Sequence, residues 1–164
     1  MGSKIIKVIV FAIAFAFVEA AVVVYLRHLL GAVQPQVARE EVLLLIPGIA
    51  FLEPQTALKI ITNSKLLNVE LVREAATLVM LAALAALAAK TLKGIAAFFL
   101  LAFGIWDIFY YIFLKLTIGW PASLSDLDTF FLLPFPWVGP VIVPILISSL
   151  LTAGSLFYLT RRKS

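Results

Sequence analysis

The chain has 164 residues, of which 63% are hydrophobic and only 13% are charged. A water-soluble domain is about 45–50% apolar and about 25% charged, so too little polar surface is left to cover a soluble fold of this size. The absence of cysteine excludes disulfides and thiolate metal sites, and a single histidine, His28, excludes multi-histidine metal sites. The net charge of +4 comes from basic residues near the ends of apolar runs, which points to membrane topology and not to a nucleic acid partner.

Four apolar runs are long enough to cross a hydrocarbon core of about 30 Å, which takes about 20 helical residues. They cover, approximately, residues 7–30, 67–89, 94–116 and 139–160. Because backbone amides in lipid must be hydrogen-bonded within their own segment, each run is expected to be a helix. The sequence therefore predicts an all-α integral membrane protein, a four-transmembrane-helix bundle that forms one transmembrane domain over 1–164. Gly104 and Gly154 are expected to allow close helix packing.

The connection between the first two runs, residues 31–66, contains the apolar stretch Val42–Leu52, which is broken by Pro47-Gly48. This stretch is too short to span a bilayer as a helix. We expect a re-entrant or interfacial segment between spans one and two, although residues 42–53 and their neighbours could instead form a fifth span.

The connection between the last two runs, residues 117–138, is rich in aromatic residues and proline. The spacing of Pro134 and Pro136 is incompatible with a continuous helix. Asp126 and Asp128 are expected to be turn or capping residues, because Ser125-Asp126 is typical of a turn or helix start.

The orientation follows from where the basic residues lie. With four spans, one face of the membrane holds only basic residues: Lys4, Lys7, Lys90, Lys93, Arg161, Arg162 and Lys163. The opposite face mixes bases with acids, and both long connections are on that side. The positive-inside rule then places both termini in the cytoplasm and both connections on the outer face. In a prokaryote this is a protein of the cytoplasmic (inner) membrane.

Three of the predicted spans carry an acid deep inside: Glu19, Glu74 and Asp107. Counting about 1.5 Å per helical residue places all three about 18 to 22 Å from the cytoplasmic ends of their spans. An acid or arginine at mid-helix costs about 2.5–3.5 kcal/mol on insertion scales, so these groups must face the interior of the bundle. We expect them to form one site for a cation, a proton or a divalent metal ion, which carboxylates bind well. The alternative is a buried polar network that ties helices together.

Further polar residues lie near these acids and are expected to support the site. Glu70 and Glu74 share a helix face at i,i+4, and Arg73 can pair with Glu70 at i,i+3. A tyrosine hydroxyl one turn beyond Asp107 could hydrogen-bond its carboxylate. The remaining supporting candidates are Thr77, Tyr110, Tyr111 and Ser148. His28 is expected to lie at the interface, and Glu40 and Glu41 in solvent, unless the loop folds back and brings one of them to the site.

Three functions follow from this pattern. The first is a small membrane protein that binds a cation or proton at the carboxylate layer and transports or senses it. The second is a membrane enzyme whose carboxylates hold a metal or act as general acid and base on a lipophilic substrate. The third is a non-catalytic subunit or scaffold whose acids pair with Arg73 or with a membrane-protein partner. The sequence leaves open whether the protein is an enzyme, and which small ion or lipophilic ligand it takes.

Overall fold

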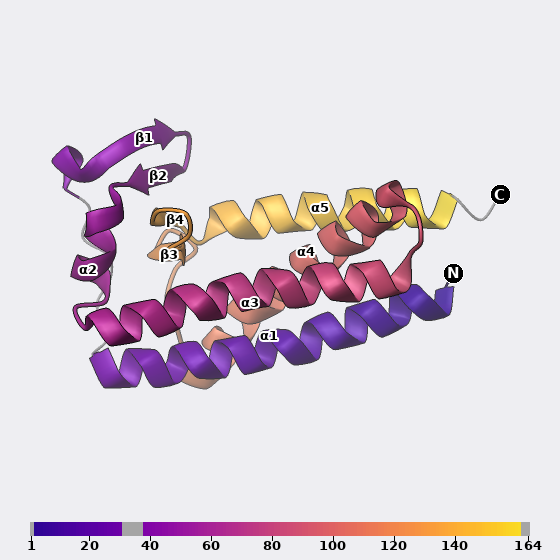
Figure 1. Cartoon of the computed structure of the whole chain (residues 1–164), viewed down its shortest axis with the longest axis horizontal. Coiled ribbons are helices and arrows are strands. Elements are labelled where there is room, and N and C mark those ends of the chain that lie inside the picture. Colours follow the sequence, from indigo (N-terminus) through magenta and orange to yellow (C-terminus); the bar gives the residue numbers. More distant parts are fainter. Residues whose placement is uncertain (1, 31–37, 162–164) are drawn as a thin grey trace.

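The computed structural model describes residues 2–30 and 38–161 of the chain. Four long helices run side by side along the molecule, as Figure 1 shows. Each is long and apolar enough to cross a membrane. They are α1 (Gly2–Leu30), α3 (Ser64–Ala88), α4 (Leu92–Ile118) and α5 (Ile142–Arg161). The expected four long apolar helices are therefore present, with somewhat different ends.

Side-chain caps explain where two of these helices begin. The Asn63 side chain accepts hydrogen bonds from the backbone N–H groups of Lys65 and Leu66, at 3.0 and 3.2 Å, so α3 starts before the apolar run itself. Thr91 caps α4 in the same way through the N–H of Gly94, at 3.3 Å. At its other end α4 stops at Gly119, whose φ of 70° suits glycine.

The expectation of an all-α fold is wrong in one respect, because the two long connections together form a small antiparallel sheet. Its strands lie in the order β1-β2-β4-β3, so β2 of the first connection pairs with β4 of the second. This pairing is also why α5 begins at Ile142 and not at residue 139. The strands are β1 (Val42–Ile46), β2 (Ile49–Leu52), β3 (Leu127–Phe131) and β4 (Trp137–Pro140).

The apolar stretch over 42–52 is a β-hairpin, so it forms no fifth spanning helix. Pro47 and Gly48 make the turn, and Gly48 has a φ of 84°, which residues with a side chain rarely adopt. Two short strands then satisfy each other's backbone groups, with Leu45 opposite Ala50 and the turn closed by Ile46 opposite Ile49.

Short helical turns connect this hairpin to the bundle. They are η1 (Arg39–Glu41) before β1, and η2 (Pro54–Thr56) followed by α2 (Ala57–Ile60) after β2. An ion pair between Glu41 and Lys59 links η1 to α2. The part of the first connection over 31–37 lies outside the described residues.

The two ends of the bundle differ. At one end, here called the terminal end, lie the start of α1, the end of α5 and the α3–α4 turn (Figure 1). The Lys4 ammonium donates to the Ala88 carbonyl there, at 2.9 Å, which holds the start of α1 beside the end of α3. Arg161 ends α5 at this end, whereas Arg162 and Lys163 lie outside the described residues. The opposite, sheet end carries β1–β4 and α2.

The apolar core fills the terminal half of the bundle. Side chains from all four long helices meet there, among them Val8, Ala12, Leu81, Phe98, Leu101 and Leu159, each at most 2% exposed. The three acids predicted to lie deep in the bundle, Glu19, Glu74 and Asp107, lie nearer the sheet end.

Candidate functional site

A cavity of about 940 Å³ lies in the sheet-end half of the bundle. Helices α1, α3 and α4 form its walls, and β3 with the residues around it forms another side. The segments around α2 cover it. Because the exposed Lys59 belongs to the lining, the cavity reaches the molecular surface beside α2. Glu19, Glu74 and Asp107 all line this one cavity, but the structure gives each of them a different partner.

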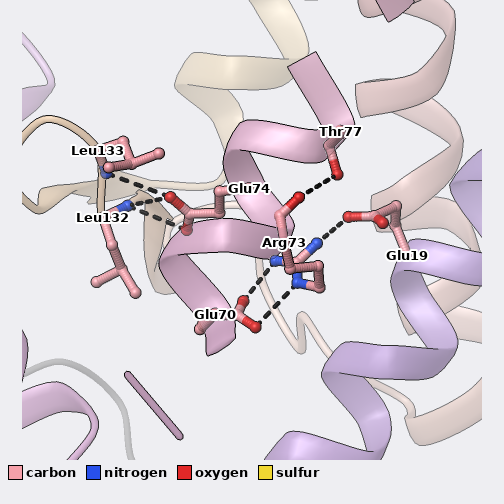
Figure 2. A network of polar contacts seen from close by, with 7 residues as sticks. All are labelled: Glu19, Glu70, Arg73, Glu74, Thr77, Leu132 and Leu133. Atoms are coloured by element: carbon pink, nitrogen blue, oxygen red, sulfur yellow. Dashed lines mark hydrogen bonds and ion pairs between the residues drawn. The ribbon is translucent and has the colours of Figure 1, made fainter. Parts of the chain in front are cut away.

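Arg73 bridges Glu19 and a further acid of the lining, Glu70. Its guanidinium forms ion pairs with Glu70 on its own helix and with Glu19 on α1, and the bond from Nε to Glu70 is 2.9 Å long. Figure 2 shows Arg73 reaching from α3 toward Glu19. The i,i+3 pairing of Arg73 with Glu70 is thereby confirmed. One cation thus serves two buried carboxylates, so one negative charge in this group is not balanced by a base when both carboxylates are ionised.

Glu74 points away from Glu19, toward the residues that follow β3 (Figure 2). Its carboxylate accepts hydrogen bonds from the backbone N–H of Leu132, at 2.9 and 3.1 Å, and from that of Leu133, at 3.2 Å. Buried backbone donors need acceptors, and Glu74 supplies one where the chain leaves the sheet. Glu74 therefore fixes the β3–β4 connection to α3.

Asp107 lies where α4 packs on α5. It is buried, and the Ser148 hydroxyl donates to its carboxylate at 2.7 Å. The helices come close here because Gly104, one turn earlier, has no side chain: a Cβ at Gly104 would lie 2.7 Å from the Ser148 carbonyl oxygen. At Gly154 a Cβ would meet nothing within 4 Å, so the expectation that Gly154 also serves close packing is wrong.

The other supporting candidates have separate roles. The Thr77 hydroxyl lines the cavity but donates to the Arg73 carbonyl of its own helix, at 3.0 Å. The tyrosine hydroxyl expected to bind Asp107 goes elsewhere, because Tyr111 donates to Asp128 at 3.0 Å. Tyr110 lines the cavity, and no hydrogen bond of its hydroxyl is found among the described residues.

Asp128, expected to be a turn or cap residue, instead lies in the cavity lining. Only Asp126 has that role, since it accepts from the N–H groups of Ala122 and Ser123, at 2.8 and 3.1 Å. Asp128 is buried on β3 and pairs with Arg27 of α1 at 3.2 Å. Burial raises the pKa of Asp128 to about 6, although Arg27 and the Tyr111 hydroxyl stabilise its ionised form.

A signal for this pair was present in the sequence. Arg27 lies near the end of the first span and would need an acid on the same side of the membrane. Arg27 also stacks on Trp120, with its guanidinium carbon 3.6 Å from the ring centroid.

Of the loop acids expected in solvent, Glu41 folds back to the cavity lining, where its hydrogen bond with Lys59 lowers its pKa. His28 is exposed and takes no part in the lining.

Three aromatic residues of α4, together with Trp120 just after the helix, form a continuous wall of the cavity. Trp106 stacks with Tyr110 at 6.1 Å between ring centroids, Tyr110 meets Tyr111 edge-on at 5.1 Å, and Tyr111 lies 6.2 Å from Trp120. All four residues line the cavity. Below, "aromatic wall" means Trp106, Tyr110, Tyr111 and Trp120.

The carboxylates do not gather as metal ligands would. Within residues 2–30 and 38–161, no group of three or more His, Asp or Glu side chains is arranged to hold a metal ion. Figure 2 shows the reason for two of them: Glu19 of α1 lies on one side of α3, whereas Glu74 points from α3 to the other side. The acids share one cavity as separate, individually hydrogen-bonded groups.

Comparison with protein families, characterised proteins and solved structures finds no significant match to this chain. The class of protein therefore follows from the fold and the site alone. Four long apolar helices able to cross a membrane, around several buried carboxylates, are the features of a small polytopic membrane protein.

Proposed function

We propose that this protein binds a cation or proton in the sheet-end cavity, and that this binding serves transport or sensing. The supporting observation is the charge of the lining. The acids there are Glu19, Glu41, Glu70, Glu74, Asp107 and Asp128, and the bases are Arg27, Lys59 and Arg73. Six acids against three bases leave a formal excess of three negative charges when all are ionised.

The ion pairs show where this excess lies. Arg27 balances Asp128 and Lys59 balances Glu41, whereas Arg73 is shared by Glu19 and Glu70. Among the described residues, Glu74 and Asp107 accept hydrogen bonds from neutral donors alone, namely backbone N–H groups and a serine hydroxyl. Excess negative charge in a cavity favours uptake of a cation or of protons.

The packed terminal half argues against a permanently open pore. The apolar core closes the bundle below the cavity, with Leu81 and Leu101 fully buried. A bound cation would therefore cross only after a change of conformation, as in a transporter, or would stay bound and act as a signal. With the orientation predicted from the basic residues, the cavity faces the outer side of the membrane.

Proteoliposomes test this proposal directly. We expect the wild-type protein to be stabilised by cations, or by a lower pH, and to support cation or proton flux or a cation-dependent conformational change. Glu74→Gln and Asp107→Asn should reduce the effect several-fold, whereas Glu53→Gln, an exposed acid outside the lining, should not. No cation or pH response in the wild type would refute the proposal. A response that is identical in all variants would remove these two carboxylates from it.

A second candidate function, an enzyme acting on a lipophilic substrate, is favoured by the size of the cavity. A volume of about 940 Å³ suits a small organic molecule, and Tyr110 offers a hydroxyl beside the acids for proton transfer. Covalent change of a supplied amphiphile, detected by mass spectrometry and lost in Tyr110→Phe, would support this alternative. A monomer with a fully paired, unresponsive network would instead favour a structural subunit.

A further inference from the structure

We infer that the cation taken by this cavity is organic: an ammonium group carried on an apolar carbon skeleton. This inference rests on the proposed function and narrows it to a ligand class. It depends on three features of the described residues, which are the size of the cavity, the dispersed acids and the aromatic wall.

Size and geometry disfavour a bare inorganic ion. A metal ion needs several oxygens converging at about 2.0–2.6 Å, and the described carboxylates show no such group. The cavity, at about 940 Å³, is as large as those that enclose drug-sized ligands. Dispersed acids suit a ligand whose charge is attached to a larger body, because that body fills the remaining space.

The aromatic wall provides the complementary surface for an ammonium. Cations bind over the faces of tryptophan and tyrosine rings, and this wall already holds one, since Arg27 lies 3.6 Å above the Trp120 centroid. Further along the wall, Tyr110 lines the same cavity as the Arg27–Asp128 pair and the Glu19–Arg73–Glu70 group.

The most favourable binding position for the ammonium group is between Tyr110 and the Glu19–Arg73–Glu70 group. That group holds two carboxylates for one guanidinium, so a second cation would complete the charge balance. The Tyr110 hydroxyl, which has no hydrogen bond to any other described residue, can accept one from an N–H of the ligand. Apolar lining residues such as Val23, Leu26 and Ile60 can contact the carbon skeleton.

An ammonium could come from a soluble amine or from the headgroup of an aminophospholipid. Both share the recognised chemistry, so the test includes an arm for each. The protein is reconstituted in nanodiscs of phosphatidylglycerol, which carries no ammonium group, or in discs that also contain phosphatidylethanolamine.

The probes are hexylammonium, its neutral analogue hexanol, its anionic analogue hexanoate, and the inorganic ions K⁺ and Mg²⁺. Tryptophan fluorescence and the unfolding temperature report binding. We expect saturable binding of hexylammonium and at least about tenfold weaker binding of the other four. Tyr110→Leu should weaken hexylammonium binding by about tenfold, and Tyr110→Phe by less, because it keeps the ring. Tyr25→Leu, a control on the exposed face of α1, should change nothing.

The outcomes are distinguishable. Binding of K⁺ or Mg²⁺ without hexylammonium would overturn this inference and leave the proposed function standing. Hexanol binding as tightly as hexylammonium would also overturn the inference of an ammonium ligand. Absence of any cation binding would refute both this inference and the proposed function. If Tyr110→Leu does not fold, the relative affinities of the five probes for the wild-type protein still test whether the ligand is an ammonium. Weaker hexylammonium binding in phosphatidylethanolamine discs would identify the lipid headgroup as a competing source, whereas equal binding would favour a soluble amine; either supports an ammonium ligand.

Discussion

Arg73 is held between Glu70 on its own helix and Glu19 on α1, and its side chain is 21% exposed. Removing one partner of a buried ion pair leaves an uncompensated charge, at a cost of about 3–5 kcal/mol. We expect Arg73→Met to lower the free energy of unfolding by about 3 kcal/mol, the lower part of that range, because the guanidinium is partly exposed. Denaturant titration of the protein in detergent micelles measures this change.

The matched control for Arg73→Met removes the stranded charges as well. The triple variant Glu19→Gln, Glu70→Gln, Arg73→Met should recover most of the lost stability, because neutral amides cost far less to bury than carboxylates. If the single variant is as stable as the wild type, the ion pairs do not tie α1 to α3.

Asp128 makes stability depend on pH through its raised pKa of about 6, compared with an ordinary value of 3.8. Between these values the folded protein holds a proton that the unfolded chain has released. This group's contribution is therefore fully present below about pH 4 and is lost as the pH rises toward 6, by an amount on the order of 3 kcal/mol. Asp128→Asn should flatten that part of the curve. Unfolding temperatures measured from pH 4 to pH 8 in both proteins test this, and parallel curves would contradict it.

Ion pairs and hydrogen bonds between residues close in the sequence could be predicted, whereas those between distant residues could not. Arg73 with Glu70 follows from helix geometry, because residues three apart share a face. Arg27 with Asp128 crosses 101 positions and depends on how the second connection folds back. The choice of Ser148, and not a tyrosine, as the donor to Asp107 depends on the close approach of α4 and α5, which no local pattern shows.

At the scale of elements, the α4–α5 contact depends on one glycine. A methyl group at Gly104 would press on the Ser148 backbone and on Thr152. We expect Gly104→Ala to destabilise the protein by about 1–3 kcal/mol, the usual range for overpacking, and to strain the neighbouring Asp107–Ser148 hydrogen bond. Gly154→Ala is the matched control, because its methyl group meets open space and should change stability by at most about 0.5 kcal/mol. Equal effects in unfolding titrations would refute the close contact.

The hairpin β1–β2 is expected to lie in the membrane interface. Its first strand is apolar and exposed, with Leu45 at 72% and Leu44 at 56%. The turn lies against the start of α5, since a Cβ on Gly48 would be 2.7 Å from Cγ2 of Val143. A large exposed apolar patch at the end of membrane-spanning helices is best covered by lipid.

A single fluorescent label tests the position of the hairpin. Because the chain has no cysteine, Leu45→Cys can carry a polarity-sensitive dye without background labelling. We expect a blue-shifted emission that is quenched by lipids with nitroxides near the headgroup. Ser125→Cys, in an exposed polar loop, should give the emission of a dye in water. Water-like emission from both positions would place the hairpin outside the lipid.

The hairpin also shows where prediction from sequence fails at this scale. The stretch Val42–Leu52 has continuous apolar character with no alternation, so periodicity could not distinguish strands from a short buried helix. Its Pro47-Gly48 turn was visible, but the partner that makes it part of a sheet, β4, belongs to a connection more than 80 residues later. Tertiary pairing of this kind determines strands more strongly than local preference.

For the whole molecule, the predictable part is the number and length of the apolar helices. The four long helices followed from apolar length, and counting residues placed Glu19, Glu74 and Asp107 at similar depth; all three line one cavity. Depth follows from sequence because helices rise uniformly. The direction in which each side chain points around the helix axis depends on packing among the four helices and the sheet. This packing directs Glu74 toward Leu132 and Arg73 toward Glu19.

The orientation of the whole molecule in the membrane is the remaining prediction, and it decides which compartment supplies the ligand. The terminal end carries basic residues without acids, among them Lys4, Lys93 and Arg161, so we expect it in the cytoplasm and the sheet end outside. Single cysteines at exposed positions of the two ends, Ser3→Cys and Gln55→Cys, can be labelled with a membrane-impermeant maleimide in intact cells. Gln55→Cys should react at once, whereas Ser3→Cys should react only after permeabilisation. The reverse pattern would turn the cavity toward the cytoplasm, and the cation bound there would then be drawn from the cytoplasmic pool.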